Sequence, residues 1–267
     1  MGKICLDELK KIELDILIYI DQVCTNNNLR YFLCGGTLLG AIRHKGFIPW
    51  DDDVDICMPR PDYDRFIEIM RQTDSKYKVL SPEQKDYYYT FSKVVDCETT
   101  LYECEHQPID NMGVYVDIFP LEGMPSDQSI CSKHFDDLNG LRLRINSFSF
   151  CKPKFRKNLI ALLRTLYLYQ KNKKDSLLKF QEKYEKLARQ YHYDESEYVY
   201  ATGGAYGRKD IFKRDLFLDL IKVKFEGTEF FAPQEFDEYL KQLYGDYMQL
   251  PPVEKRVSNH SYEAKYR

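Results

Sequence analysis

Four aspartates lie within five positions of the sequence: Asp51, Asp52, Asp53 and Asp55. The segment from Asp53 to Cys57 alternates polar and apolar residues, which predicts a half-buried strand with Asp53 and Asp55 on one face. Two carboxylates held side by side repel each other, and a divalent cation with oxygen ligands removes that repulsion. The pattern therefore predicts a metal site on Asp53 and Asp55, assisted by Asp51.

Magnesium or manganese is the metal that this motif favours. Both ions take one or two carboxylates and fill their other positions with water and substrate phosphate. A calcium loop of the EF-hand kind does not fit, because Ile56 stands where the loop needs glycine and Asp62 where it needs glutamate. A solvated acidic turn without metal is the alternative. We expect Mg²⁺ (or Mn²⁺) as the cofactor.

A glycine-rich segment, Gly35-Gly36-Thr37, lies between an expected strand at 31–34 and an expected short helix. Glycines allow close approach, and the free N–H groups at a helix start attract anions, so these three residues are candidates for binding phosphate. The segment lacks the endings of a P-loop or a dinucleotide fold, and a purely structural turn is the alternative. Its short connection to Asp53 predicts that both features lie at one end of one sheet.

Basic residues flank the acidic segment on both sides: Arg43, His44 and Lys45 precede it, and Arg60 follows it. In phosphoryl transfer, negative charge gathers on oxygens as the bond to the leaving group breaks, and nearby cations stabilise that charge. These four residues are therefore candidates to bind the phosphates of a substrate. A basic loop that only balances the acidic segment is the alternative.

The elements that would position these residues are predicted from hydrophobic periodicity. Helices are expected at 6–24, 62–71 and 233–243, strands at 77–80, 88–95 and 114–119, and a hairpin turning at Glu226-Gly227 over 222–231. From about 130 to 190 the pattern is helical. We expect an α+β fold, a mixed sheet flanked by helices, as a single domain over 1–267 with a helical subdomain or insertion around 130–190.

Composition narrows the function classes. The chain has 267 residues, 43% of them hydrophobic and 30% charged, and a net charge of −3. That balance argues against a nucleic-acid-binding protein, and no apolar run approaches the ~20 residues of a membrane span. The N-terminus has no secretion signal, so we expect a cytoplasmic protein. The eight cysteines are scattered singly, which favours reduced thiols.

One segment departs from this balance, because residues 152–174 contain eight Lys or Arg and no acidic residue. Leucines and aromatic residues alternate with these cations, as in an amphipathic helix. Packing on its own domain is the ordinary interpretation of such a helix. The alternative is a helix that lies on an anionic membrane surface, which gives a peripheral membrane protein.

Three segments make the chain recognisable. The run GGTLLGAIRHKGFIPWDDDVDICMPR from Gly35 to Arg60 closely resembles the signature of the LicD family, the phosphocholine transferases related to fukutin. The segment YVDIFP at 115–120 resembles the family's second motif. FEG at 225–227 and LYGDYMQLPP at 243–252 resemble its C-terminal block. The resemblance spans nearly the whole chain and is least diagnostic from about 125 to 200.

The resemblance implies a nucleotidyltransferase-like fold and transfer of phosphocholine from CDP-choline to a sugar hydroxyl. The acceptor would be a cell-surface glycan precursor, such as teichoic acid or lipopolysaccharide, and it could be carried on a lipid. The resemblance also implies that Asp117 is the third carboxylate of the site, as a metal ligand or as the acceptor of the hydroxyl proton. A quaternary ammonium is held over ring faces, and Trp50 and Tyr115 are the aromatic residues nearest in sequence.

Two other functions use the same residues. One is nucleotidyl transfer to a sugar or polyol phosphate, in which the attack falls on the other phosphorus of the donor. The other is a metal-dependent nucleotide-binding regulator without turnover. The family also contains members that act on other activated polyol phosphates, so choline is the part of the substrate that the sequence determines least.

Overall fold

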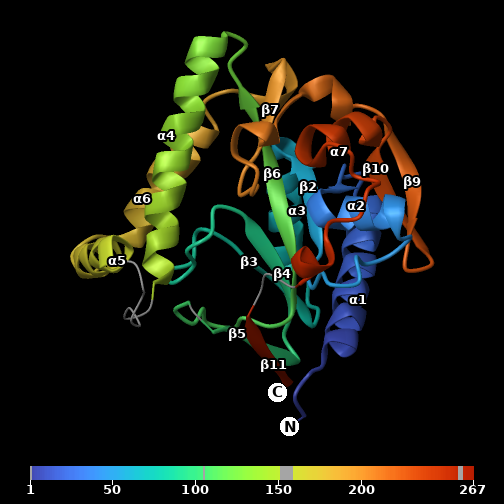
Figure 1. The fold of residues 1–267 in the computed structure, drawn as a ribbon, viewed down its shortest axis with the longest axis horizontal. Coiled ribbons are helices and arrows are strands. Elements are labelled where there is room, and N and C mark those ends of the chain that lie inside the picture. The colour runs from blue at the N-terminus through green and yellow to red at the C-terminus, as the bar shows by residue number, and fades with distance from the viewer. Residues whose placement is uncertain (1, 105, 151–158, 258–260) are drawn as a thin grey trace.

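The structure is a computed structural model that describes residues 2–104, 106–150, 159–257 and 261–267 (Figure 1). Its helices are α1 (Leu6–Asn26), α2 (Gly35–Arg43), α3 (Arg60–Gln72), α4 (Gln128–Asn146), α5 (Leu159–Asn172), α6 (Leu177–Ala188) and α7 (Phe236–Tyr244). Its strands are β1 (Phe32–Leu33), β2 (Asp55–Pro59), β3 (Tyr77–Leu80), β4 (Ser92–Asp96), β5 (Thr99–Glu103), β6 (Tyr115–Met124), β7 (Tyr198–Ala201), β8 (Ile211–Lys213), β9 (Leu220–Phe225), β10 (Thr228–Pro233) and β11 (Tyr262–Tyr266).

The main sheet is mixed, as expected for an α+β fold. Its strands lie in the order β1-β2-β6-β4-β3, and β7 and β8 extend it from the far half of β6. Strands β2 and β6 are parallel, whereas the other described pairs of this sheet are antiparallel. Strand β6 therefore runs through the centre of the molecule, as Figure 1 shows, and touches three neighbouring strands.

Strand β6 is longer than the sequence predicted, because it continues through Pro120 to Met124. Proline has no N–H for the ladder and is usually confined to strand edges or bulges. Here the neighbour on one side changes at this point: β4 pairs with β6 as far as Ile118, and β7 pairs from Leu121 onward. Pro120 falls in the gap between them, so its missing donor costs no strand pairing on that side.

Helices α1 and α3 pack against the strands of this sheet. Helix α1 buries Leu9, Ile16 and Ile20, which recur along one face at the spacing that the sequence showed. Helix α3 begins at Arg60 and buries Phe66 and Met70 in the same hydrophobic core. Both expected helices are confirmed, with boundaries within two residues of the prediction.

Helices α4, α5 and α6 stand together on one side of the molecule (Figure 1), which confirms the helical pattern predicted around 130–190. Helices α4 and α6 form a second hydrophobic cluster with Met124 and Tyr200 of the sheet. Residues 151–158, which include Lys152, Lys154, Arg156 and Lys157 of the basic segment, lie outside the described residues. None of the described helices is both long and apolar enough to cross a membrane.

The hairpin β9–β10 turns at Glu226-Gly227, as predicted. Both residues have positive φ, +49° and +79°, which is the backbone that a two-residue hairpin turn requires and that glycine adopts at little cost. Strands β5 and β11 form a separate pair near the two chain ends, which lie close together in Figure 1. The sequence did not predict β5, β7, β8 or β11.

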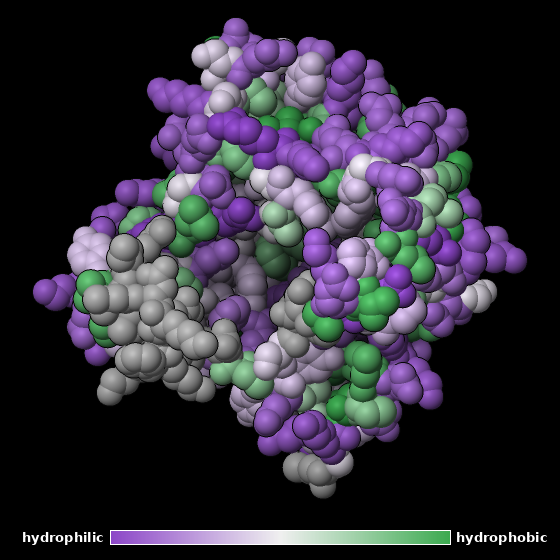
Figure 2. Space-filling model, viewed as in Figure 1, coloured by the Kyte–Doolittle hydropathy of each residue, from purple (hydrophilic) through white to green (hydrophobic). Residues whose placement is uncertain are grey.

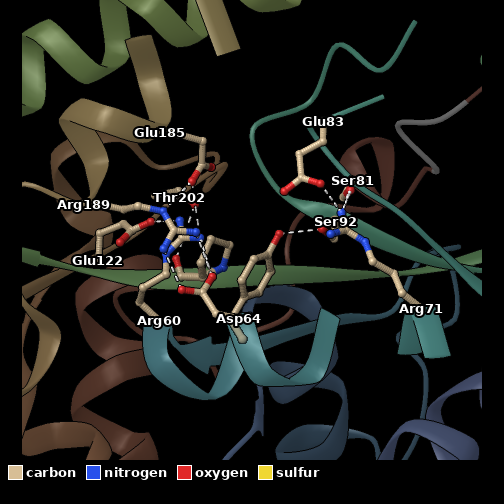
Figure 3. A network of polar contacts seen from close by, with 12 residues as sticks. Arg60, Asp64, Arg71, Ser81, Glu83, Ser92, Glu122, Glu185, Arg189 and Thr202 are labelled. Atoms are coloured by element: carbon tan, nitrogen blue, oxygen red, sulfur yellow. Dashed lines mark hydrogen bonds and ion pairs between the residues drawn. The ribbon is translucent and has the colours of Figure 1, made fainter. Parts of the chain in front are cut away.

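A network of ion pairs ties helix α3 to the sheet and to α6 (Figure 3). Arg60 is buried, pairs with the buried Glu122 of β6, and also lies 3.3 Å from Asp64 and 3.6 Å from Glu185. Its guanidinium lies 4.9 Å from the ring centre of Tyr63. A buried charge is tolerated in a fold only when it is paired, so Arg60 and Glu122 depend on each other.

Replacing Arg60 should destabilise the protein strongly. Arg60→Met leaves Glu122 buried without its partner, and we expect the free energy of unfolding to fall by about 3–5 kcal/mol. Arg71→Met is the matched control, because it breaks an exposed pair with Glu83 in the same view and should cost about 0–1 kcal/mol. Urea unfolding followed by circular dichroism measures both variants. Equal losses would contradict the importance assigned to the buried pair.

Candidate active site

The predicted acidic residues meet in one cavity of about 750 Å³ over the main sheet. Figure 2 shows the corresponding face hollowed near its centre. Its lining includes Gly35 and Gly36 together with the four carboxylates Asp51, Asp53, Asp55 and Asp117. The glycine turn and the acidic segment therefore do lie at one end of one sheet.

Strand pairing places two of these carboxylates side by side. Asp55 begins β2, and its register partner on the parallel strand β6 is Asp117. The backbone N–H of Asp117 donates to the carbonyl of Val54 at 2.9 Å, which fixes the two strands at this point. Asp53 lies just before β2, so the strand starts two residues later than predicted. Asp117 thus stands on the strand next to that of Asp55.

The carboxylates of the cavity repel one another, and this repulsion shifts the pKa of Asp55. The pKa of Asp55 is raised well above its ordinary value, first by burial and then by the charges of Asp53, Asp117 and Asp51. Glu13 of α1 lies behind them, and burial together with the charges of Asp53 and Asp52 raises its pKa in the same direction. Glu13 occupies a regular position in an amphipathic helix, so the sequence gives no signal that it belongs to the site.

The donor set fits a magnesium or manganese ion that is completed by substrate. Asp53 and Asp55 would supply the one or two carboxylates that these ions take, and a dication would relieve the mutual repulsion described above. Among the described residues, no group of three or more His, Cys, Asp or Glu side chains is arranged to hold a metal by itself. Water and phosphate oxygens would have to fill the other positions.

The start of helix α2 braces the acidic segment. The hydroxyl of Thr37 accepts a hydrogen bond from the backbone N–H of Asp55 at 2.8 Å, and the N–H of Gly35 donates to the Tyr239 hydroxyl at 3.0 Å. A Cβ on Gly36 would lie 2.6 Å from a carboxylate oxygen of Asp51, so a larger residue there would push that carboxylate aside. Thr37 thus positions Asp55, a role that the sequence analysis did not assign to it.

The structure separates the four predicted basic residues. Arg43 lines a smaller neighbouring cavity of about 460 Å³, which shares Gly36 and Asp51 with the larger one. His44 packs edge-on against Trp50, and burial lowers its pKa. Lys45 is exposed and lines neither of these two cavities.

Arg60 requires a correction. It follows Pro59 at the opposite end of β2 from Asp55, and its guanidinium is held by the buried network of Figure 3. It lines a different cavity, between α3 and α6. The prediction that Arg60 binds donor phosphates beside the carboxylates therefore does not agree with its position.

Several residues of the cavity were missed by sequence reasoning. Lys93 of β4 donates to Asp117 at 2.7 Å, and its side chain is only 2% exposed. Glu103 of β5 accepts from Tyr89 at 2.5 Å and lies 2.7 Å from His106. The one available signal was Lys93 itself, a lysine inside an apolar strand pattern, because lysine is rarely buried without a partner.

Comparison with known proteins places these motifs in a family. Residues 28–142 match the family model described as LicD/FKTN/FKRP, nucleotidyltransferase domain. The chain is 34% identical, over 99% of its own length and 99% of the relative's, to the lipopolysaccharide cholinephosphotransferase LicD of Haemophilus influenzae. Uncharacterized proteins of Rickettsia typhi and Rickettsia prowazekii match shorter stretches, at 47% identity over 19% of this chain and 40% over 24%; these stretches are 16% and 24% of the two relatives.

The buried carboxyls predict a pH-dependent stability for the metal-free protein. The pKa values of Asp55 and Glu13 are raised, and burial raises that of Asp210 to about 6. Folding favours the protonated form of each group, so the stability gained at low pH is lost as the pH rises through the raised pKa values. In EDTA, we expect a lower melting temperature at pH 8 than at pH 5. Glu13→Gln should reduce that difference, and a melting temperature that rises with pH would contradict the assignment.

Proposed function

The chain belongs to the LicD family, and from that membership we propose that it transfers phosphocholine from CDP-choline to a sugar hydroxyl of a cell-surface glycan precursor, with release of CMP. The observation that carries the proposal is the end-to-end similarity to a lipopolysaccharide cholinephosphotransferase, together with the convergence of the first two motifs on one cavity. A glycan such as lipopolysaccharide or teichoic acid supplies the acceptor hydroxyl.

The chemistry balances as a single displacement at phosphorus. The acceptor oxygen forms a bond to the phosphorus that carries choline, and the bond from that phosphorus to the bridging oxygen breaks. CMP departs with the bridging oxygen and its electron pair, and the hydroxyl proton passes to solvent or to a carboxylate. A carboxylate beside a dication is a weak base, so positioning and charge stabilisation are the larger contributions to the rate.

Asp53 and Asp55 would hold Mg²⁺ or Mn²⁺, assisted by Asp51 and by Asp117. When bound, the ion neutralises the charge of the donor phosphates and of the developing leaving group. The chain's own contribution is to fix the carboxylates: Thr37 holds the backbone of Asp55, and the β2–β6 register aligns Asp55 with Asp117. The N–H of Gly35 donates to Tyr239, so in this proposal the N–H of Gly36 and the side chain of Arg43 face the donor phosphates.

The products discriminate this function from its alternatives. Incubation with CDP-choline, Mg²⁺ and a panel of sugar acceptors should release CMP and leave phosphocholine on the acceptor. Nucleotidyl transfer would instead place CMP on the acceptor and release phosphocholine, and a regulator would form neither product. Asp53→Asn or Asp55→Asn should lower turnover by at least ~10³-fold while the protein stays folded, and EDTA should do the same to the wild type. Full activity in EDTA would exclude the metal.

We also propose that the basic segment contacts an anionic membrane that carries the acceptor. In the described part of α5, Leu163, Leu166 and Tyr167 are exposed by 57%, 38% and 64%. Lys171, Lys173 and Lys174 are exposed close by. Apolar side chains beside lysines are suited to the boundary of an anionic bilayer, where each lysine contributes about 1 kcal/mol.

Vesicle binding tests this contact. Sedimentation with vesicles that contain anionic lipid should capture the protein at low salt and lose it at high salt. The triple variant Lys171→Glu, Lys173→Glu, Lys174→Glu should bind at least ~10-fold more weakly. The triple variant Lys85→Glu, Lys224→Glu, Lys255→Glu makes the same charge change at exposed positions elsewhere and is the control. Equal losses in both variants would mean that net charge alone, and not this segment, determines binding.

A further inference from the structure

A row of three charged side chains crosses the floor of the cavity. Asp55 of β2 is in register with Asp117 of β6, and Asp117 is in register with Lys93 of β4. All three residues line the same cavity. The order of charges across the three strands is therefore negative, negative, positive, and Asp117 stands between a carboxylate and an ammonium.

Lys93 is held in this place from several sides. Its ammonium donates to Asp117 at 2.7 Å and lies 3.5 Å from the ring centre of Tyr115, 4.5 Å from that of Tyr89 and 5.3 Å from that of Phe91. An ammonium that is buried in this way loses its hydration, and it keeps its charge only where a counter-charge and ring faces replace the water. Every residue of β4 is buried, and the Lys93 side chain is only 2% exposed where it meets the cavity.

Two of the three rings around Lys93, those of Tyr89 and Tyr115, are held by Glu103. The hydroxyl of Tyr89 donates to this carboxylate at 2.5 Å and the hydroxyl of Tyr115 at 3.4 Å. His106 contacts the same carboxylate, and these contacts, with the charge of Lys93, lower the pKa of Glu103 to about 2 although burial opposes them. The cage around Lys93 is thus braced by an ionised group, and the position of the ammonium is determined by the fold.

We propose that Lys93 is a positioning residue that gives the carboxylates different roles in the transfer reaction. Its charge compensates that of Asp117, and its hydrogen bond engages one oxygen of Asp117. The metal is thereby left mainly to Asp53 and Asp55. This inference rests on the proposed function for its kinetic part and on the geometry alone for its metal-binding part.

The proposal predicts opposite effects on metal binding and on turnover. Lys93→Met removes a positive charge close to the metal and releases Asp117, so the dissociation constant for Mg²⁺ should fall by about three- to tenfold. Turnover should fall by ~10²–10³-fold, because Asp117 is no longer held in its place. A lysine that only stabilised the fold would weaken metal binding and activity together. Calorimetric titration of the protein with Mg²⁺ gives the first quantity without any substrate.

The controls separate charge from shape. Lys93→Arg keeps the charge and should bind Mg²⁺ as the wild type does. Lys76→Met is the matched control, because Lys76 also pairs with an aspartate, Asp96 at 3.0 Å, and lies 5.0 Å from the ring centre of Tyr77. Lys76 does not line the cavity, and its replacement should change neither metal binding nor turnover. Should Lys93→Met fail to fold, Lys93→Gln replaces it with the same expectations.

The outcomes are decisive. Weaker or unchanged Mg²⁺ binding in Lys93→Met, or a shift of more than threefold in Lys93→Arg, would overturn the assignment of Lys93. A wild type that binds Mg²⁺ but forms no phosphocholine product would refute the proposed function, and the titrations would still decide the role of Lys93. Tighter Mg²⁺ binding with reduced turnover supports both.

Discussion

Repulsion between buried carboxylates is the constraint to which the rest of this structure responds. The in-register pairing of β2 with β6 brings Asp55 against Asp117, and Asp51, Asp53 and Glu13 add charge around them. Such a cluster lowers the stability of the fold unless cations or hydrogen-bond donors compensate it. The surroundings supply Lys93, which donates to Asp117, and the Thr37 hydroxyl, which holds the backbone N–H of Asp55. A bound dication would compensate the remaining negative charge of the cluster. Metal binding would therefore stabilise the fold and prepare the site for the reaction at the same time.

Strand β6 allows this cluster to form inside a well-packed sheet. Its first half carries Asp117 between β2 and β4, and its second half carries Glu122, which pairs with Arg60. The same strand therefore holds a charged residue for the cavity at one end and one for the α3–α6 network at the other. The change of neighbour at Pro120 separates the two halves. Asp117 pairs with Lys93 and Glu122 pairs with Arg60, so the charges at the two ends of β6 do not share a partner.

The sequence predicted the elements whose patterns are local. Periodic burial identified α1 and α3, the Glu226-Gly227 turn identified the β9–β10 hairpin, and the alternation after Asp53 identified the acidic strand. Contacts between distant segments could not be predicted in this way. Lys93 reaches Asp117 only because β4 pairs with β6, and the buried network that captures Arg60 depends on α6, more than a hundred residues away. A basic residue next to an acidic motif in sequence is thus an unreliable guide to the phosphate site.

The first motif is long because residues at its start and residues near its acidic segment contact one another in the folded protein. Strand β1 is antiparallel to β2, so the chain must turn back between Cys34 and Asp55, and α2 with its following loop makes this return. Where the chain comes back to the sheet, the Asp51 carboxylate lies close to Gly36, and the Thr37 hydroxyl accepts a hydrogen bond from the backbone N–H of Asp55. A substitution in the glycine turn therefore displaces a carboxylate of the cavity even though it removes no charge. The glycines, the threonine and the aspartates therefore act as one structural unit.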